Sequence, residues 1–185
     1  MPETALLLLS IASGVAIAAG TWIVLSRTGV VAAEGRDASA GRDAIAALAG
    51  RADATLAGIA ARIDQVRRGQ AEPTELADPL PLAQAEVAAL VDDARSVAAP
   101  HGLSGIRDDI AAELERAERA LDMVEHGRGI MLNARLRGRE LEAQTAVKRG
   151  YLNLLHAREA IARHASRAAA WRSPTEAWRD ARQRR

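Results

Sequence analysis

The sequence IAALAGRADATLAGIAARIDQV, residues 45–66, repeats small and apolar residues at alternating intervals of four and three. The repeating positions are Ile45, Ala49, Ala52, Leu56, Ile59, Ile63 and Val66. This spacing places them along one side of an α-helix and is typical of helices that pack in a bundle or coiled coil. We therefore expect a long helix here, ended by Gly69 and Pro73.

The same spacing continues in later segments of the chain. A second seam holds Ala83, Val87, Leu90, Ala94 and Val97, and a third holds Ile110, Leu114, Ala117, Leu121 and Val124. The last long helix, about 130 to 171, carries Leu132, Leu136, Val147, Tyr151, Leu154, Ile161, Ala165 and Ala168. These segments predict three further helices.

Local signals predict where those helices begin. Asp78-Pro79 is typical of a helix start, because proline in the first turn lacks only an amide that has no helical partner. Ser104 is expected to cap the helix after Pro100-His101-Gly102, with Asp108 and Asp109 near its positive end. If the third seam continued beyond Val124, its positions would be occupied by residues such as Arg, Gly and Glu, which cannot form an apolar stripe. We therefore expect the chain to reverse at Gly127-Arg128-Gly129.

The number of helical passes depends on the break at residues 100–102. If every break reverses the chain, helices starting near residues 36, 79, 104 and 130 make four passes. If the break only kinks one helix, there are three, and the similar lengths of 79–126 and the last helix favour this reading. The serine cap after the break favours four, which we prefer.

Composition supports an all-α fold. Alanine, the best helix former, makes up about a quarter of the chain, and phenylalanine is absent. Residues 36–171 are therefore expected to form an elongated antiparallel helical bundle or coiled-coil hairpin with a thin core. The lack of cysteine excludes disulfides and thiolate metal sites. A net charge of +1 does not favour a nucleic-acid partner.

An uncharged segment precedes the predicted bundle. Leu6 to Leu25 is about 30 Å long as a helix, enough to span a bilayer core. We expect residues 1–28 to form a retained anchor and 29–35 a linker, although Ala16-Ile17-Ala18 also permits cleavage of a signal peptide. Arginines follow the span and none precedes it, which predicts a single-pass protein of the cell membrane with a cytoplasmic C-terminal domain.

Small residues recur on one face of this span. Ala12, Ala16 and Gly20 lie four residues apart, a spacing that lets two membrane helices approach closely. These residues are candidate helix–helix contacts in the membrane. The alternative is that they reflect the general abundance of alanine and glycine in membrane spans.

The C-terminal segment 172–185 is basic. It has five arginines against Glu176 and Asp180, a net charge of +3. Ser173-Pro174-Thr175-Glu176 fits a capping box, so a separate amphipathic helix is expected to start there. Trp171 and Trp178 are seven residues apart and would share a helix face. The candidate contacts with anionic lipid are Trp171, Trp178, Arg179, Arg182, Arg184 and Arg185, while the alternative packs both tryptophans on the bundle end.

No motif for catalysis or nucleotide binding is present in the sequence. His156, Glu159 and His164 are the best metal candidates, but they lack the paired Glu-x-x-His motifs of a di-metal bundle, so no enzyme activity, cofactor or metal is expected. The segment 142–156 departs most from the alanine-rich background. Within it, Lys148, Tyr151 and His156 form the candidate surface for a protein partner.

These observations lead to three hypotheses of function. The preferred one is a non-enzymatic, single-pass membrane scaffold or accessory subunit of a membrane assembly. Its expected partners are the lipid bilayer and either another protein or a second copy through helix contacts. The second is a membrane-surface sensor or remodelling protein that acts through its basic tail. The third is a helical-bundle metal enzyme using His156 and Glu159.

Overall fold

The computed structural model describes residues 37–136 and 138–183. The predicted span Leu6–Leu25, with Ala12, Ala16 and Gly20, and the linker 29–35 lie outside the described residues. The chain divides into two units. Ala40–Trp171 is one unit, and Arg172–Arg185 belongs to the other.

Every regular element in the described ranges is helical, which confirms the all-α prediction. A first helix covers Asp37–Arg67 and is followed by the short 3-10 turn η1, Pro73–Leu76. Helices α2 (Pro79–Ser96) and α3 (His101–Leu132) come next. The 3-10 turn η2 (Ala134–Leu136), α4 (Glu140–Ala170) and α5 (Pro174–Gln183) complete the order.

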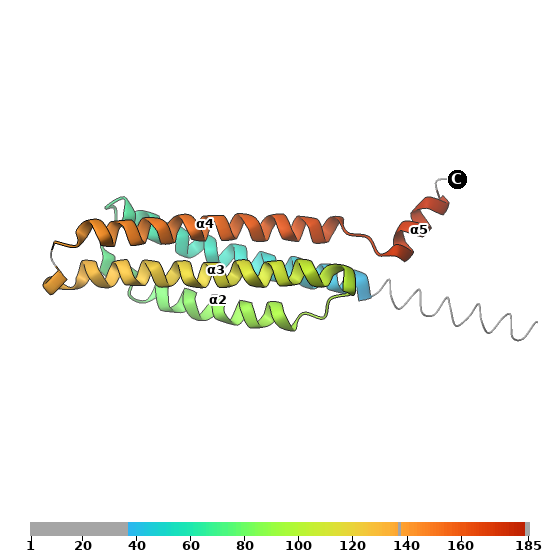
Figure 1. Ribbon diagram of the computed structural model, residues 1–185, viewed down its shortest axis with the longest axis horizontal. Coiled ribbons are helices and arrows are strands. Elements are labelled where there is room, and N and C mark those ends of the chain that lie inside the picture. Colours follow the sequence, from blue (N-terminus) through green and yellow to red (C-terminus); the bar gives the residue numbers. More distant parts are fainter. Residues whose placement is uncertain (1–36, 137, 184–185) are drawn as a thin grey trace, which may run out of the picture. The chain divides into compact units, whose positions relative to one another are not determined.

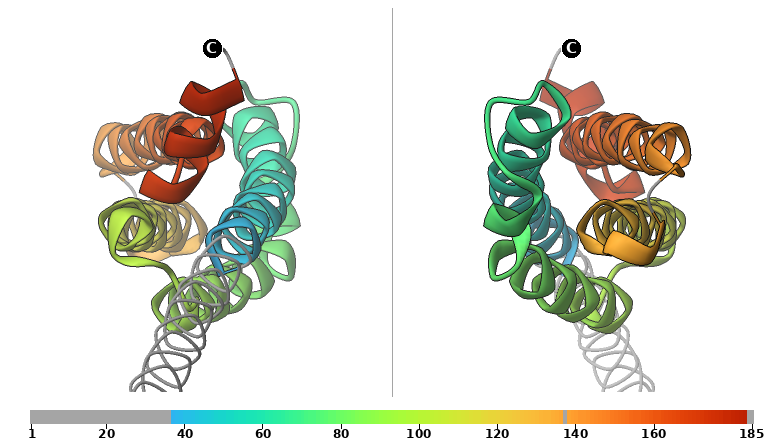
Figure 2. Two further views of the ribbon diagram at one scale, coloured as in Figure 1. Left: turned by 90° about the vertical axis from the view of Figure 1, so that its right-hand side faces the viewer. Right: turned by 90° about the vertical axis from the view of Figure 1, so that its left-hand side faces the viewer.

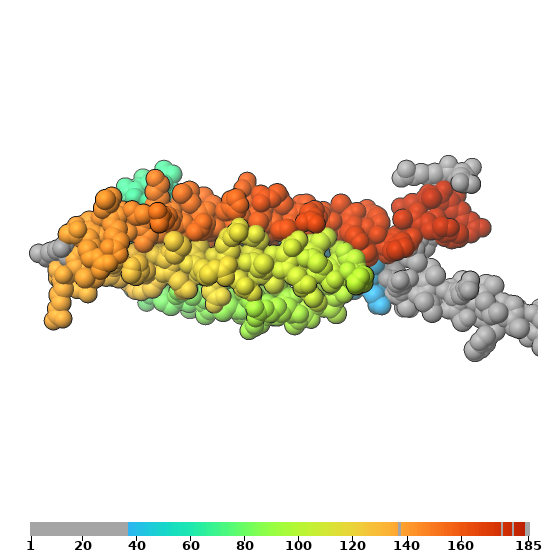
Figure 3. All heavy atoms as spheres, in the orientation of Figure 1, coloured from blue at the N-terminus to red at the C-terminus, as the bar shows by residue number. Residues whose placement is uncertain are grey.

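Within Ala40–Trp171, the four long helices run alternately in opposite directions (Figure 1). Seen end-on, they surround a common core (Figure 2). The chain therefore makes four passes, as the break at Pro100 favours, and this unit is an antiparallel helical bundle. In the space-filling view α3 and α4 lie side by side along the bundle (Figure 3).

The first helix ends at the predicted glycine. Gly69 has a φ of +69°, a conformation that glycine adopts without steric cost. Its amide donates to the Val66 carbonyl at 3.0 Å, and the Gln70 amide donates to the Gln65 carbonyl at 2.8 Å. These two bonds satisfy carbonyl groups that the end of the helix leaves free, in the arrangement of a Schellman cap.

The helix after the break at residues 100–102 starts earlier than predicted. Helix α3 begins at His101, because the Pro100 carbonyl accepts the amides of Leu103 at 2.8 Å and Ser104 at 3.0 Å. The Ser104 hydroxyl donates to the His101 carbonyl inside the first turn. Ser104 is therefore not the cap, and the first turn holds no acidic residue. Helix α2 starts at Pro79 as predicted, although the Asp78 side chain makes no capping bond.

The predicted reversal at Gly127-Arg128-Gly129 is wrong. Helix α3 continues through these residues to Leu132, and the chain turns only at residues 133–139. Gly127 is buried, and a Cβ atom there would lie 2.7 Å from Val147 Cγ2 and 2.8 Å from the Ala143 carbonyl oxygen. This glycine lets α4 approach α3 and does not break the helix. Helix α4 consequently starts at Glu140, and Leu132 and Leu136 lie before it.

The core is built from the predicted seams. All seven residues of the first seam and all five of the third are buried. The largest fully buried side chains come from every helix of the bundle, for example Ile45, Leu80, Leu114 and Leu154. Many other core positions are alanine, such as Ala52, Ala94, Ala117 and Ala157, each with 0% exposure. The core is consequently thin, and the helices pack closely.

One helix of the described part, Asp37–Arg67, is long and apolar enough to cross a membrane by length and composition. Its most apolar window is 39% buried within the protein. The same residues that raise its hydropathy, such as Ile45, Leu56 and Ile63, form its side of the bundle core. A buried helix of a soluble bundle meets the same criterion.

Gly150 on α4 is buried as well, and a Cβ atom there would lie 2.6 Å from the Ala120 carbonyl oxygen on α3. Gly127→Ala and Gly150→Ala should each lower the free energy of unfolding by about 1–3 kcal/mol, because the new methyl group overpacks the contact between α3 and α4. Gly129→Ala is the matched control, since nothing lies within 4 Å of its Cβ position. It should stabilise the protein by up to about 1 kcal/mol through helix propensity. Urea unfolding of the full chain in detergent, followed by circular dichroism, measures these changes. Equal stabilities for Gly127→Ala and Gly129→Ala would contradict the assigned packing role.

Candidate functional site

The outward face of α4 exposes two large apolar side chains. Leu141 is 78% exposed and Leu152 is 51% exposed. They are eleven residues apart, close to three full helical turns, so they lie on the same side of α4. Two exposed leucines aligned on one helix face form a candidate contact site for another helix.

Helix α4 in fact carries two stripes with the same spacing. Its inner stripe is buried and consists of Ala143, Val147, Gly150, Leu154, Ala157 and Ile161. A second set follows the same four-and-three spacing on the opposite side: Leu141, Thr145, Lys148, Leu152, Leu155, Glu159 and Ala162. We call this set the outer stripe. Its members are exposed or half-buried, and the half-buried Leu155 also packs against the edge of the core. Helix α4 therefore has one face in the core and a second, partly apolar face of which the rest is turned to solvent.

Shallow hollows border the outer stripe. One, at the end of the Asp37–Arg67 helix, is lined by Lys148 together with Gln144 and Arg67, and two others are lined by leucines of the stripe. Of these two, the first lies between α3 and α4, where Met123 and His126 face Leu141, Thr145 and Ala146. The second lies between the Asp37–Arg67 helix and α4. It is lined by Asp53, Leu152, Leu155, His156, Arg158, Glu159 and Ala162. Apolar side chains of a partner on the outer stripe would therefore meet recessed surface as well as exposed leucines.

Ion pairs fix α4 beside its neighbours at these hollows. Arg158 donates to Asp53 on the first helix at 2.6 Å, and this bond raises the pKa of the Arg158 guanidinium. At the start of α4, the Arg139 guanidinium lowers the pKa of the Glu142 carboxyl through a hydrogen bond. Glu142 also lies 3.8 Å from His126 on α3. These contacts are solvent-exposed, so they orient the helices more than they stabilise them.

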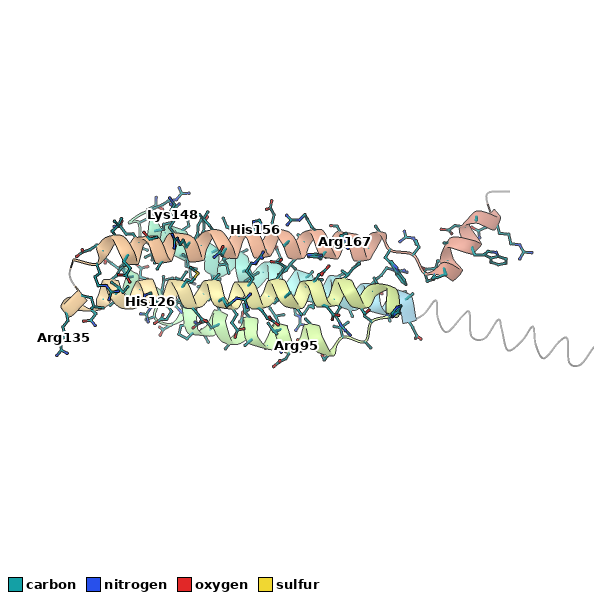
Figure 4. All side chains as sticks on the ribbon, in the orientation of Figure 1. Arg95, His126, Arg135, Lys148, His156 and Arg167 are labelled. Carbon is teal, nitrogen blue, oxygen red and sulfur yellow. The ribbon has the colours of Figure 1, made fainter. Side chains whose placement is uncertain are left out.

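The predicted partner residues do not all lie on one face. Lys148 and His156 are both exposed on α4 (Figure 4), with Lys148 on the outer stripe and His156 in the second hollow. Tyr151 is half-buried on the flank of α4, where the Arg67 guanidinium carbon is 5.2 Å from its ring centroid. Sequence analysis missed the exposed Leu141 and Leu152. Their signal was a second four-and-three repeat beside the main seam.

The candidate metal ligands His156, Glu159 and His164 do not lie in one place. His156 lines the second hollow together with Glu159, whereas the His164 Nδ1 atom lies 3.4 Å from Asp109 on α3. Arg167 on α4 is also 3.4 Å from the same Asp109 carboxylate. Across the part of the chain that the structure describes, no group of three or more possible metal ligands comes together.

Trp171 and Trp178 do not share a helix face, because α4 ends at Ala170 and α5 begins at Pro174. The Trp171 ring lies against Gly102, where an added Cβ would be 2.5 Å from Trp171 Cζ2. The Trp171 carbonyl accepts a 3.3 Å hydrogen bond from Arg42. Trp171 therefore closes one end of the bundle. For this residue the structure agrees with the alternative expectation, in which the tryptophans pack on the bundle end and do not contact lipid.

Helix α5 has the predicted capping box. The Glu176 amide donates to the Ser173 hydroxyl at 3.2 Å, and the Ser173 amide donates to the Glu176 carboxylate at 2.9 Å. Trp178 is 63% exposed, and the Arg182 guanidinium carbon lies 5.1 Å from its ring centroid. Arg184, Arg185 and the side chain of Arg179 lie outside the described residues.

Among the described residues, the outer stripe of α4 presents two exposed leucines on one face, and α5 presents the exposed pair Trp178 and Arg182. Comparison with known proteins finds no matching family model, curated protein or solved structure.

Proposed function

We propose that the protein is a non-enzymatic, single-pass membrane-anchored scaffold, or an accessory subunit of a membrane protein assembly, whose helical bundle lies in the cytoplasm. The uncharged segment Leu6–Leu25 supports the anchor, since its length matches a bilayer core. The arginines at positions 27, 36 and 42, with none before the segment, support the cytoplasmic orientation.

The outer stripe of α4 is the observation that carries the scaffold role. Exposed leucine has an unfavourable contact with water, and burying one against a partner contributes about 1.5–3 kcal/mol. Leu141 and Leu152 present this apolar area on one face, with Lys148 between them in the stripe. An amphipathic helix face of this kind binds another helix through side chains at three- and four-residue intervals.

Helix α5 supports a second candidate function, binding to the membrane surface. Trp178 is largely exposed and stacked with Arg182, which gives an apolar ring beside a cation. Tryptophan and arginine in this combination suit the headgroup region, where the ring meets the acyl boundary and the cation meets anionic phosphate. A sensor or remodelling protein would use this tail as its main contact, whereas a scaffold would use α4.

The full chain should remain in the membrane fraction after washing with alkaline carbonate and should be released by detergent. A soluble bundle that only adheres to the membrane surface would be released by the carbonate wash. Replacing Val15 and Ile17 with arginine should shift the protein to the soluble fraction, because charges near the middle of the segment oppose insertion. Release of the unaltered protein by carbonate would contradict the anchor.

A photo-reactive amino acid at Leu152 should form protein adducts in intact membranes, because the scaffold hypothesis places a partner on the outer stripe. The same amino acid at Leu82 is the matched control, since Leu82 is 65% exposed but lies on α2. Adding Leu141→Ser should reduce the Leu152 adducts by about tenfold, since part of the apolar contact is lost. Equal adducts at both positions would indicate random collision and remove the contact role of α4.

In a Trp22→Phe, Trp171→Phe background, brominated lipids should quench Trp178 fluorescence more strongly in anionic than in zwitterionic nanodiscs. The basic tail is attracted to anionic headgroups, and salt should weaken that attraction by screening it. Charge reversal at Arg182, Arg184 and Arg185 should lower the quenching. Equal quenching in both lipids would exclude electrostatic binding by the tail.

A further inference from the structure

The order of side chains along the outer stripe is complementary to itself. From Thr145 onward it runs small, basic, leucine, leucine, acidic, small, ending at Ala162. Read from Ala162 back to Thr145, the order is the same except that the basic and the acidic positions are exchanged. A helix with this property matches a second copy of itself that runs in the opposite direction, which is the requirement for a two-fold symmetric contact.

The matching positions follow from one centre, the point between Asn153 and Leu154. When two α4 helices cross antiparallel at this point, Leu152 of one copy lies opposite Leu155 of the other. One layer further out, Lys148 lies opposite Glu159. At the outer ends of the stripe, Thr145 lies opposite Ala162. Each pair therefore joins apolar with apolar, positive with negative, or small with small.

The charged pair can form across such a contact without breaking an ion pair between helices. Lys148 is exposed, and among the described residues it has no ion pair within 4 Å. Glu159 is 75% exposed at its side chain and has a 3.7 Å pair with Arg163 on its own helix. Both side chains are long enough to reach a neighbouring helix. In a parallel pairing Lys148 would oppose Lys148 and Glu159 would oppose Glu159, so charge selects the antiparallel direction.

The hollow beside the stripe provides room for the second copy. Leu152, Leu155, Glu159 and Ala162 line it on the α4 side, and the Arg158–Asp53 ion pair bounds it on the other. The two leucines of a second copy would lie over this recess in the antiparallel crossing. Small residues at both ends, Thr145 and Ala162, would let the helices approach closely. The Thr145 hydroxyl already donates to the Leu141 carbonyl at 2.7 Å, so its methyl group is available for packing.

From these matches we propose that the outer stripe of α4 binds the same stripe of a second copy, antiparallel, with Lys148 of each copy paired to Glu159 of the other. The proposal rests on the proposed scaffold function and names its partner. A stripe on one helix makes a small interface, so the association is weak and depends on concentration in the membrane.

Chemical cross-linking tests the register, because the chain contains no cysteine and single substitutions give unambiguous products. Lys148→Cys and Glu159→Cys proteins carrying tags of different size are mixed as full chains in nanodiscs and treated with a short bis-maleimide. The mixture should give the mixed dimer. Either protein alone should give at least fivefold less dimer, because like positions are separated by about 16 Å along the helix axis. Leu82→Cys, exposed on α2, replaces either partner as the control.

Charge reversal tests the pairing with a rescue. Lys148→Glu should weaken dimerisation about fivefold, measured by energy transfer between labelled full chains, because each symmetric contact then opposes two carboxylates. Glu159→Lys should weaken it similarly, since two ammonium groups then face each other. The double variant should return the dimerisation constant to within about twofold of the original. Loss without rescue would overturn the proposed pairing.

The remaining outcomes separate this proposal from the scaffold function. Efficient cross-linking of Lys148→Cys with itself would overturn the antiparallel register and indicate parallel pairing. A monomeric full chain whose Leu152 adducts contain a different protein would overturn the second copy as partner and leave the scaffold role intact. A monomeric chain without adducts at Leu152 would overturn both.

Discussion

The close contact between α3 and α4 sets the geometry on which the surface of the bundle depends. Two glycines make this contact in a reciprocal way. Gly127 on α3 lies under Val147 and the Ala143 carbonyl, and a Cβ added at Gly150 on α4 would lie 2.6 Å from both the Ala120 carbonyl oxygen and Val124 Cγ2. Because each backbone occupies space that a side chain would need on the other helix, the two axes approach more closely than larger residues would permit. The alanines of the inner stripe extend this close packing along α4.

The close packing of α4 on α3 leaves the outer face of α4 exposed, and apolar side chains lie on that face. Half of its inner stripe consists of alanine or glycine, so the bundle takes up a narrow strip of the helix surface and leaves most of the opposite strip uncovered. A polar outer strip would suffice for solubility, and α3 shows that pattern where Glu115, Arg116 and Arg119 lie on its surface. Helix α4 instead places Leu141 and Leu152 outward. Leu82 on α2 is also exposed, so exposure alone does not distinguish α4; the distinguishing feature is that Leu141 and Leu152 lie on one face of the same helix.

Much of the fold follows from sequence, since helix seams and glycine stops are local signals. The first seam, the stop at Gly69 and the capping box at Ser173 and Glu176 needed no knowledge of neighbouring helices. Gly127 could not be assigned in this way, because glycine serves both helix termination and close helix packing. The choice depends on whether a partner backbone faces it, here α4. Trp171 is a similar case, because its place against Gly102 depends on the end of α4 meeting the start of α3.

The candidate site could be predicted only in part from the sequence, again because it depends on which helix faces pack together. Composition directed attention to Lys148 and His156, but a leucine in an alanine-rich helix is first assigned to the core. Only the assembled bundle shows which of two parallel repeats on α4 is buried. The repeat that remains outside differs from the buried one in having Lys148 and Glu159 at two of its positions. A continuous leucine stripe would bind other helices in either direction, whereas opposite charges on the two sides of a central leucine pair add an energetic difference between directions. The outer stripe thus combines exposed apolar area with opposite charges placed on either side of it, and in the proposed contact the apolar area would supply the binding energy while the charges would set the direction.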